Sequence, residues 1–303
     1  MIDFRKITPE DKSLYENFKQ GISERGCEFS FANLYLWGRQ RIAFIEGHAL
    51  LFSQFNRRTV YPYPVGNGDK KAVIDAIIAD AKERGIPCRI TGLNAEARGV
   101  MERLYPDAFR YHCDRDSFDY VYDINDLADL AGKKYQKKRN HVNKFKAQNP
   151  DFSLEPIGAE NIEAVRAMID GWYEARLAED PEADYIMERA ALEKALRDYA
   201  LLEMEGLALV CGGRIVAVTL GSRMSENTFD VHFEKAVPDV QGAYTAIASF
   251  FACYIREKHP DVAFLNREED MGIEGLRKSK ESYYPHHMVE KCWACLLEDG
   301  CDY

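Results

Sequence analysis

LALVCGGRIVAVTLGSRMSENTFDVHFEKA, residues 207–236, is the stretch that decides the fold class of this chain. Two apolar runs flank the Gly212-Gly213 pair, which predicts two antiparallel strands joined by a tight turn. Residues 228–236 alternate between apolar and polar side chains, as a third strand does. The next segment, 242–260, has apolar residues at helical spacing and predicts a buried helix. A strand at 262–266, a helix at 272–282 and an extended run at 287–298 complete the series.

The first half of the chain shows the same order of elements. Three short strands between residues 41 and 65 precede a helix at 70–84, a strand from residue 88, a helix at 95–104 and extended chain at 109–124. An antiparallel meander followed by one strand–helix–strand crossover is the plan of GNAT-type acyltransferases. We therefore predict an α/β fold with mixed sheets, built from two tandem GNAT-like domains. The predicted domains are residues 1–125 and 126–303, and the second is expected to carry the active cleft.

The composition is that of a globular chain. Of the 303 residues, 46% are hydrophobic, but no apolar run approaches the roughly 18 residues of a membrane span. Residues 1–20 are too charged for a signal peptide. The eight cysteines are scattered, so we expect reduced thiols in a cytoplasmic protein. The net charge of −10 argues against general coating of nucleic acid.

Residues 133–146, KKYQKKRNHVNKFK, reverse this charge locally. They contain seven Lys or Arg residues and no acid. Tyr135, Val142 and Phe145 lie near one stripe of a predicted helix, and the cations lie on the other side. One interpretation is a solvated helix face. The other is a helix that binds the phosphates of an RNA backbone or an anionic lipid, because a solvated helix normally mixes charges of both signs.

The predicted strand at 228–236 has a polar side formed by Asp230, His232 and Glu234. This side could simply be exposed. It could also line a cleft, where a carboxylate binds a substrate ammonium or accepts its proton. The following turn, PDVQGAYTA at 238–246, has a single glycine. A diphosphate-binding loop needs more glycines to present consecutive amides, so coenzyme A is not the favoured donor and no cofactor is predicted.

FLNREEDMGIEGLRKSKESYYP, residues 264–285, places many charges of both signs directly after a predicted strand. Asp270 can cap the helix that follows. Asn266 and Arg267 leave the strand at its C-terminal end, where open α/β sheets bind ligands. Arg277 and Lys280 are spaced i, i+3 and could bind phosphate or carboxylate. The CWAC motif at 292–295 lacks a second pair of metal ligands, so no metal site is predicted.

The chain resembles the soluble C-terminal domain of bacterial phosphatidylglycerol lysyltransferases in several segments: KKRNHVNKF (137–145), HFEKA (232–236), QGAY (241–244) and LNREEDMGIEGLRKSKESYYP (265–285). That family is similar in fold to peptidoglycan-bridge aminoacyltransferases, which have two GNAT-like units and use aminoacyl-tRNA in place of coenzyme A. The resemblance implies transfer of an aminoacyl group from the tRNA 3′ ester to a hydroxyl or amine. The acceptor would be a lipid headgroup or a soluble molecule.

The resemblance also singles out residues. It implies roles for Arg139, Asn140, Lys144, His232, Glu234, Asn266, Arg267, Glu268, Asp270, Gly272, Arg277 and Lys280. Among these, Glu234, His232, Arg277 and Lys280 are the predicted catalytic residues. Glu234 could hold the donor's ammonium or act as base, and Arg277 or Lys280 could stabilise the oxyanion. The predicted substrate-binding residues are those that follow: Arg139, Asn140, Lys144, Asn266, Arg267, Glu268 and Asp270, together with Lys137, Lys138 and Asp230.

Two alternatives remain open at this point. The chain could be a coenzyme A-dependent N-acyltransferase, or a non-catalytic module of the same fold that binds tRNA or an anionic headgroup. It shows no counterpart of the transmembrane half of the lysyltransferases. We therefore expect either a soluble acceptor or a peripheral contact with an anionic membrane.

Overall fold

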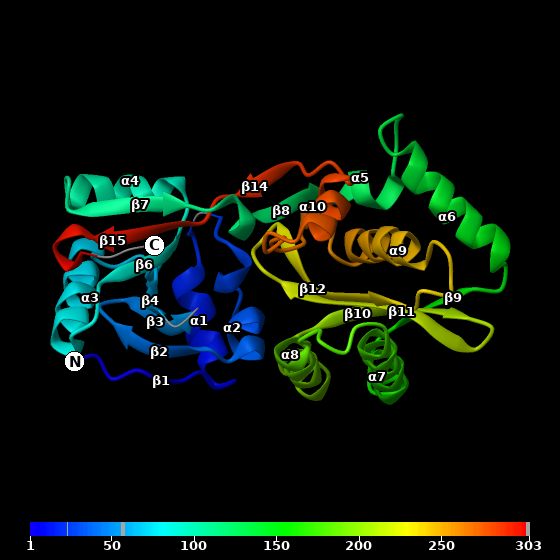
Figure 1. Ribbon diagram of the computed structural model, residues 1–303, viewed down its shortest axis with the longest axis horizontal. Helices are drawn as coiled ribbons and strands as arrows, with labels where there is room; N and C mark the ends of the chain where they lie inside the picture. Colours follow the sequence, from blue (N-terminus) through cyan, green and yellow to red (C-terminus); the bar gives the residue numbers. More distant parts are fainter. Residues whose placement is uncertain (23, 56–57, 301–303) are drawn as a thin grey trace. The chain divides into compact units, whose positions relative to one another are not determined.

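The computed structural model describes residues 1–22, 24–55 and 58–300 of the chain (Figure 1). The chain divides into two compact units that are not continuous in sequence. The first unit contains residues 1–119, 269–274 and 288–303, and the second contains residues 120–268 and 275–287. The sequence had placed one division, at residue 125, and the structure shows how the chain crosses between the units several times.

The first unit is built on one mixed sheet. Its strand order is β1-β2-β3-β4-β6-β15-β7, with β5 paired to β3. Only the β4–β6 pair among those with a described register is parallel, and this pair is the product of one strand–helix–strand crossover. The strands are β1 Arg5–Lys6, β2 Gln40–Ile45, β3 His48–Phe55, β4 Arg58–Pro62, β5 Val65–Gly66, β6 Arg89–Leu93, β7 Phe109–Cys113 and β15 Cys292–Leu296.

The helices of the first unit begin and end at residues that suit those positions. Asp69 caps α3 by accepting hydrogen bonds from the amides of Lys71 and Ala72, and Gly85 ends it in the left-handed conformation. Val73, Ile74 and Ile77 are fully buried, as their spacing predicts. The helices are α1 Asp11–Lys19, α2 Phe31–Trp37, α3 Lys70–Arg84 and α4 Ala95–Leu104.

The second unit has a sheet of the same plan, in the order β14-β8-β13-β12-β11-β10-β9. The antiparallel meander β10-β11-β12 leads through helix α9 to β13, which pairs parallel to β12. This arrangement confirms the mixed α/β fold with two GNAT-like units. The strands are β8 Asp119–Asp123, β9 Ser153–Pro156, β10 Glu205–Cys211, β11 Arg214–Arg223, β12 Thr228–Ala236, β13 Phe264–Asn266 and β14 His287–Val289.

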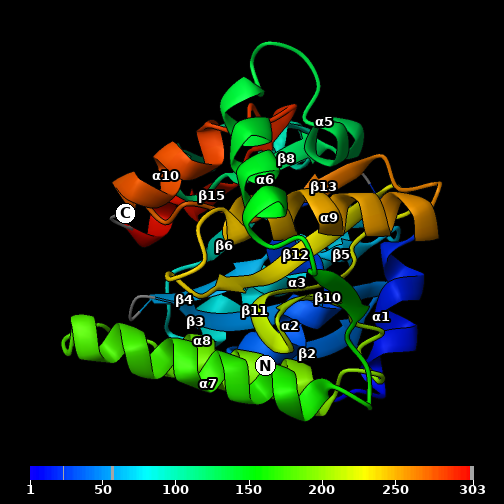
Figure 2. The ribbon, with the colours of Figure 1, turned by 90° about the vertical axis from the view of Figure 1, so that its right-hand side faces the viewer.

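Helices cover both faces of this second sheet. Helices α9 and α6 lie on one face, and α7 and α8 lie on the other (Figure 2). The predicted helices at 133–146 and 242–260 are confirmed as α6 and α9, but no element had been predicted for the segment that forms α7 and α8. The helices are α5 Ile124–Asp129, α6 Gln136–Gln148, α7 Ile162–Glu179, α8 Ile186–Arg197, α9 Ala243–Lys258 and α10 Glu274–Glu281.

Each sheet receives one strand from the other half of the chain. Strand β15, at the C-terminus, lies between β6 and β7 and pairs antiparallel with both. Strand β8, from the N-terminal half, pairs with β13 in the second sheet. The consecutive strands β7 and β8 therefore belong to different sheets, and so do β14 and β15. Neither exchange had been predicted.

The cysteines correct one expectation. Cys113 on β7 and Cys292 on β15 are direct cross-strand partners with Cα atoms 4.2 Å apart, and they form a disulfide. The prediction that all the cysteines are reduced thiols is therefore wrong for this pair, because the sequence does not show which strands are the neighbours of β15. Within the described chain, the free cysteines are Cys27, Cys88, Cys211 and Cys253. Every described helix is too short or too polar to span a lipid bilayer.

Candidate active site

The candidate site lies where the parallel strands of the second unit part. Strands β12 and β13 share three residue pairs, from Thr228–Phe264 to Asp230–Asn266, and β13 then ends. Strand β12 continues to Ala236. The C-terminal end of a parallel strand in an α/β sheet is a usual place for ligands. The side chains that follow β13 therefore meet the second half of β12 at this point.

An ion pair joins the two strands there. Arg267 Nη2 donates a hydrogen bond of 2.9 Å to Glu234 Oε1. The Glu234 side chain is 9% exposed and the Arg267 side chain 16% exposed. Burial raises the pKa of the Glu234 carboxyl, although Arg267, Lys280 and Lys138 oppose this shift. The Arg267–Glu234 ion pair is therefore largely buried, and the Glu234 carboxylate is surrounded by cations.

The guanidinium of Arg267 has spare hydrogen-bonding capacity. Its Nη1 is buried and has no hydrogen-bond partner within the described residues. Aromatic rings provide the surrounding wall: the Arg267 Cζ lies 5.1 Å from the ring centroid of Tyr283 and 5.8 Å from that of Tyr122. Buried donors are normally satisfied, so an unsatisfied guanidinium nitrogen is a good candidate for contact with a ligand oxygen.

Lys138 is the second cation at this site. It projects from α6, and its Nζ lies 3.6 Å from the centroid of the Tyr283 ring. Burial and the nearby Arg267 lower the pKa of Lys138 to about 8, against the opposing effect of Glu234. No described residue forms a hydrogen bond or ion pair with its ammonium group. An amine with this pKa can give up or accept a proton near neutral pH.

Lys280 has a different position from the one predicted for a ligand-binding residue. It is buried on α10, and its Nζ donates to the backbone carbonyls of Arg267 and Glu268. The Tyr122 hydroxyl donates in turn to the Lys280 carbonyl, at 2.9 Å. Lys280 therefore holds the segment that positions Arg267. Arg277, its predicted partner, is half-buried on the same helix.

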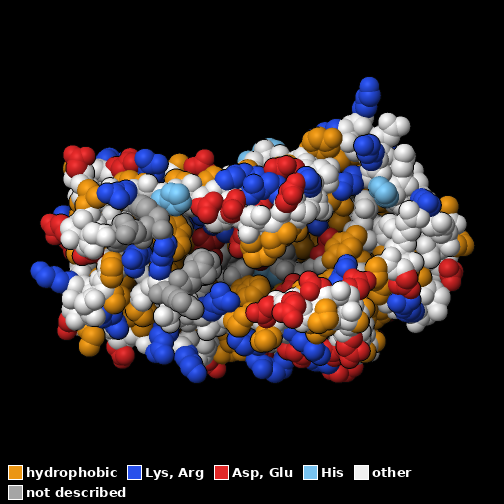
Figure 3. Space-filling model, in the orientation of Figure 1, with side chains coloured by type: hydrophobic (Ala, Val, Ile, Leu, Met, Phe, Trp, Pro, Cys, Tyr) orange, Lys and Arg blue, Asp and Glu red, His pale blue; other side chains and the backbone are white. Residues whose placement is uncertain are grey.

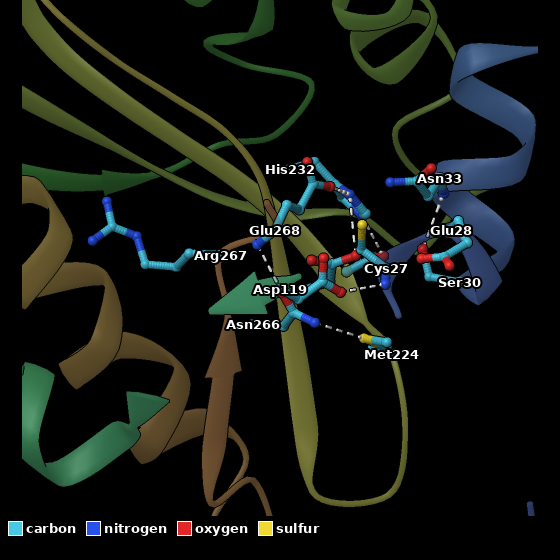
Figure 4. Close-up of polar contacts among 12 residues, drawn as sticks. Cys27, Glu28, Ser30, Asn33, Asp119, Met224, His232, Asn266, Arg267 and Glu268 are labelled. Carbon is cyan, nitrogen blue, oxygen red and sulfur yellow. Dashed lines mark hydrogen bonds and ion pairs between the residues drawn. The ribbon is translucent and has the colours of Figure 1, made fainter. Parts of the chain in front are cut away.

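A separate polar cluster contains His232. Ser222 Oγ lies 2.8 Å from His232 Nε2, and Glu268 Oε1 lies 3.3 Å from His232 Nδ1. Asp230 Oδ2 lies 3.5 Å from the same ring nitrogen. Asp230 and His232 are buried, so the interpretation of this side of β12 as an exposed polar face is excluded. Figure 4 shows Arg267 pointing away from His232 and Glu268, so the predicted polar side of β12 serves two different clusters.

A register shift explains why the predicted alternation does not hold along β12. Leu220 is opposite Phe233, whereas Gly221 is opposite Val231, so His232 is the extra residue of a β-bulge. A bulge turns the strand and re-aims the side chains that follow it. The two-residue periodicity in the sequence could not show this shift.

Among the residues that the structure describes, two groups of side chains offer enough ligand atoms for a metal ion. Asp230, His232 and Glu268 offer ligand atoms within 4.8 Å of one another, and so do Cys27, Asp119 and Glu269 in the first unit. The group of Cys27, Asp119 and Glu269 already contains a cation of the protein. Lys291 Nζ lies 2.6 Å from Asp119 Oδ1 and 3.2 Å from Glu269 Oε2. That ammonium neutralises the carboxylates.

Helix α6 carries the predicted basic surface. Val142 and Phe145 are buried, as predicted, and Lys137, Asn140 and Lys144 are exposed. Figure 3 shows Lys and Arg side chains along the outer surface of this helix.

Two cations of the basic segment have structural partners instead. Arg139 donates to the carbonyls of Leu130 and Gly132, and Lys134 pairs with Asp126 at 2.9 Å. The basic segment itself contains no acid, and Asp126, the partner of Lys134, belongs to the preceding helix α5. Arg139 therefore shapes the loop before α6, whereas Lys137, Asn140 and Lys144 remain available on its surface.

The acids and amides after β13 act largely on the local backbone. Asn266 Oδ1 accepts a hydrogen bond of 2.7 Å from the Glu268 amide, and Asp270 Oδ1 accepts one of 2.8 Å from the Gly272 amide. Because α10 begins only at Glu274, this bond lies in the turn before the helix, and the predicted capping of α10 by the Asp270 side chain is not seen. Glu268, Met271 and Gly272 all have positive φ angles. Strained backbone of this kind is concentrated at functional segments.

The aromatic residues of the site are not among the residues predicted from the sequence. Tyr244 Oη donates to the Glu234 carbonyl at 2.9 Å, and Tyr122 and Tyr283 surround Arg267. Tyr244 lies in the QGAY motif and Tyr283 in the SYYP motif, so both were within quoted segments. Tyr122 comes from the other half of the chain, so no local pattern could show that it would join them.

The turn before α9 differs from a diphosphate-binding loop in structure as well as in sequence. Gly242 is the N-cap of α9 with φ of 86°. A Cβ atom at this position would lie 2.8 Å from the His141 carbonyl oxygen of α6. Gly242 is therefore needed for the close approach of α6, which covers the helix end that would otherwise present free amides.

Comparison with known proteins places this geometry in context. The family model described as "Phosphatidylglycerol lysyltransferase, C-terminal" matches residues 19–295. A conserved protein of unknown function from Bacteroides thetaiotaomicron is 37% identical, with 98% of this chain and 100% of that chain covered and a TM-score of 0.92. L-PGS from Bacillus licheniformis is similar in fold, with 16% identity, coverage of 98% and 94%, and a TM-score of 0.71.

A more distant relative is an uncharacterized protein of Mycoplasmoides gallisepticum, which is 26% identical over 179 residues. That match covers 58% of this chain and 55% of the relative. The chain thus spans little more than half the length of this curated relative.

Proposed function

The chain belongs to the family of phosphatidylglycerol lysyltransferase C-terminal domains, and we propose that it transfers an aminoacyl group from aminoacyl-tRNA to a hydroxyl or amine. Arg267, Glu234 and Lys138 are the groups that we assign to the reaction. The acceptor is a lipid headgroup or a soluble molecule, and the reaction needs no coenzyme A.

The observation that carries this proposal is the half-satisfied guanidinium of Arg267. One terminal nitrogen is fixed by Glu234 at 2.9 Å, while the other is buried without a partner among the described residues. A donor held in this way requires no reorganisation when negative charge develops beside it. It therefore suits the oxyanion that forms when a nucleophile attacks an ester carbonyl.

An aminoacyl ester is already activated, so no covalent enzyme intermediate is required. The acceptor oxygen or nitrogen forms a bond to the ester carbonyl carbon, and the bond to the ribose oxygen then breaks. The acceptor's proton is taken up during the attack and is returned to the ribose oxygen. Lys138 can perform both proton transfers because its pKa is about 8. Glu234 orients Arg267 and can attract the α-ammonium of the donor.

The surface of α6 supports a nucleic-acid donor. Lys137 and Lys144 are exposed cations, and cations on such a helix bind phosphates through counterion release. The turn at Gly242 disfavours coenzyme A, because α6 packs against the helix end where a diphosphate would bind. Anionic lipid remains a second partner that this surface could contact.

The test is transfer from charged tRNAs to candidate acceptors, followed as protein-dependent deacylation. Lys138→Met, Glu234→Gln and Arg267→Gln should each lower kcat by at least about 100-fold, as loss of an acid–base or oxyanion group does. Lys137→Met, on the exposed side of the same helix, is the matched control and should change KM for tRNA more than kcat. Wild-type turnover of acyl-coenzyme A, with no deacylation of any charged tRNA, would refute the proposal.

A further inference from the structure

A second group of cations lies in the first unit and has no role in the proposed reaction. Arg25 Cζ lies 4.7 Å from the centroid of the Tyr63 ring, and Lys70 Nζ lies 5.8 Å from the same centroid. Tyr63 follows β4 directly, and Lys70 is the first residue of α3. The chain thus brings two cations to one aromatic ring beside the parallel pair β4 and β6.

Two polar atoms at this ring are unsatisfied. Tyr63 is 1% exposed, yet its hydroxyl has no hydrogen-bond partner among the described residues. The same is true of the buried Nη1 of Arg25. Leaving such groups unpaired in the folded state costs free energy, and native proteins rarely do so at random. Two such atoms at one ring indicate a missing partner that accepts hydrogen bonds.

The ammonium of Lys70 is held in place by neighbours that carry no negative charge. Its Nζ donates to the Gly66 carbonyl and lies 2.9 Å from His48 Nε2. The other ring nitrogen of His48 lies 2.9 Å from the Glu46 carbonyl, so His48 donates there and accepts from Lys70 as a neutral ring. Gly66 allows its strand to pack against Gly47 and His48, because a Cβ atom there would lie 2.3 Å from the Gly47 carbonyl oxygen and 2.9 Å from His48 Cδ2.

The positive charge of this pair is not balanced by an ion pair. Neither Arg25 nor Lys70 forms a salt bridge with a described carboxylate. Asp69 is next to Lys70 in sequence, but its carboxylate caps α3 by accepting from the amides of residues 71 and 72. Glu96, which is exposed, acts on both Arg25 and Lys70 through its electrostatic field, and Glu28 acts on Arg25 in the same way. Burial and the charge of Arg25 lower the pKa of Lys70 to about 8.

We propose that Arg25, Lys70 and the Tyr63 hydroxyl bind the phosphate group of a small molecule in the first unit. Two cations that have no ion-pair partner among the described residues match the two charges of a phosphate monoester, whereas a carboxylate would neutralise one. The guanidinium and the hydroxyl supply directed donors, and the ammonium supplies a point charge. The helix amides contribute little, because Asp69 already occupies the end of α3. This site is independent of the proposed aminoacyl transfer, which uses residues of the second unit.

The experiment is titration of the full chain with inorganic phosphate, followed by calorimetry and by thermal shift at constant ionic strength. Phosphate should bind saturably and raise Tm, whereas acetate and chloride at the same ionic strength should not. Arg25→Gln should weaken binding by roughly 10- to 100-fold, as loss of a charged hydrogen bond does. Tyr63→Phe should weaken it by about 3- to 10-fold.

Matched controls separate binding from folding. Lys71→Gln removes a cation from the neighbouring, exposed position, where Lys71 pairs with Asp75, and should leave phosphate affinity within about twofold. Without phosphate, Tyr63→Phe should keep or raise Tm, since it removes an unsatisfied buried hydroxyl, and Arg25→Gln should keep Tm near the wild-type value, since it removes a buried charge. Absence of saturable phosphate binding to the wild type would overturn the proposal. Equal phosphate affinities of the wild type, Arg25→Gln and Tyr63→Phe would also overturn it.

Discussion

Replacement of Lys280 by Met tests whether this residue is structural. Its buried ammonium bonds to the carbonyls of Arg267 and Glu268, at the start of the segment that carries the site. Each hydrogen bond to a charged group contributes about 1.5–3 kcal/mol, and removal of the ammonium leaves two carbonyls to find new partners. The neutral Met side chain avoids the free-energy cost of burying a charge, and this offsets part of the loss. We expect a net destabilisation of about 2–4 kcal/mol.

The measurement is thermal and urea unfolding of Lys280→Met beside Lys278→Met. Lys278 is exposed on the same helix two residues earlier, so its replacement should stay within about 0.5 kcal/mol of the wild type. For a unit of this size, the expected loss corresponds to a fall in Tm of about 5–12 °C. If both variants unfold like the wild type, the ammonium does not hold the backbone. It would then be free to bind a ligand, as the sequence analysis predicted.

Three further outcomes follow from the contacts of individual residues. If the neutral amine of Lys138 takes the proton, kcat should rise as pH increases through about 8, and Lys138→Met should lose this rise. Alanine at Lys137 and Lys144 should reduce the log–log salt slope of tRNA binding by roughly 0.7–0.9 for each residue that touches phosphate, and an unchanged slope would make α6 a solvated face. Asp80 accepts hydrogen bonds from Arg84, Ile2 and Tyr61, which lower its pKa although burial opposes the shift. Its stabilising contribution should be present above about pH 4 and decline as pH falls further. Asp80→Asn should remove that part of the acid sensitivity in unfolding curves.

Local patterns in the sequence determined the order of the elements and the mixed α/β class. The Gly212-Gly213 turn, the apolar spacing of 70–84 and the buried stripe of α6 each depend on neighbours within a few residues. Hydrogen bonding and side-chain period act over the same short range, so the sequence carries these features directly.

Only the tertiary structure decided which strands are neighbours and which side chains form the site. Arg267 and Glu234 are 33 residues apart, and Cys113 and Cys292 are 179 apart. The exchange of β8 and β15 between sheets, and the bulge at His232, decide these pairings. Such choices depend on the free energy of packing whole elements together, which is the sum of many distant contacts. No short segment of sequence contains that sum, so Lys280 could be recognised as a candidate from its charge but not as an anchor of the backbone.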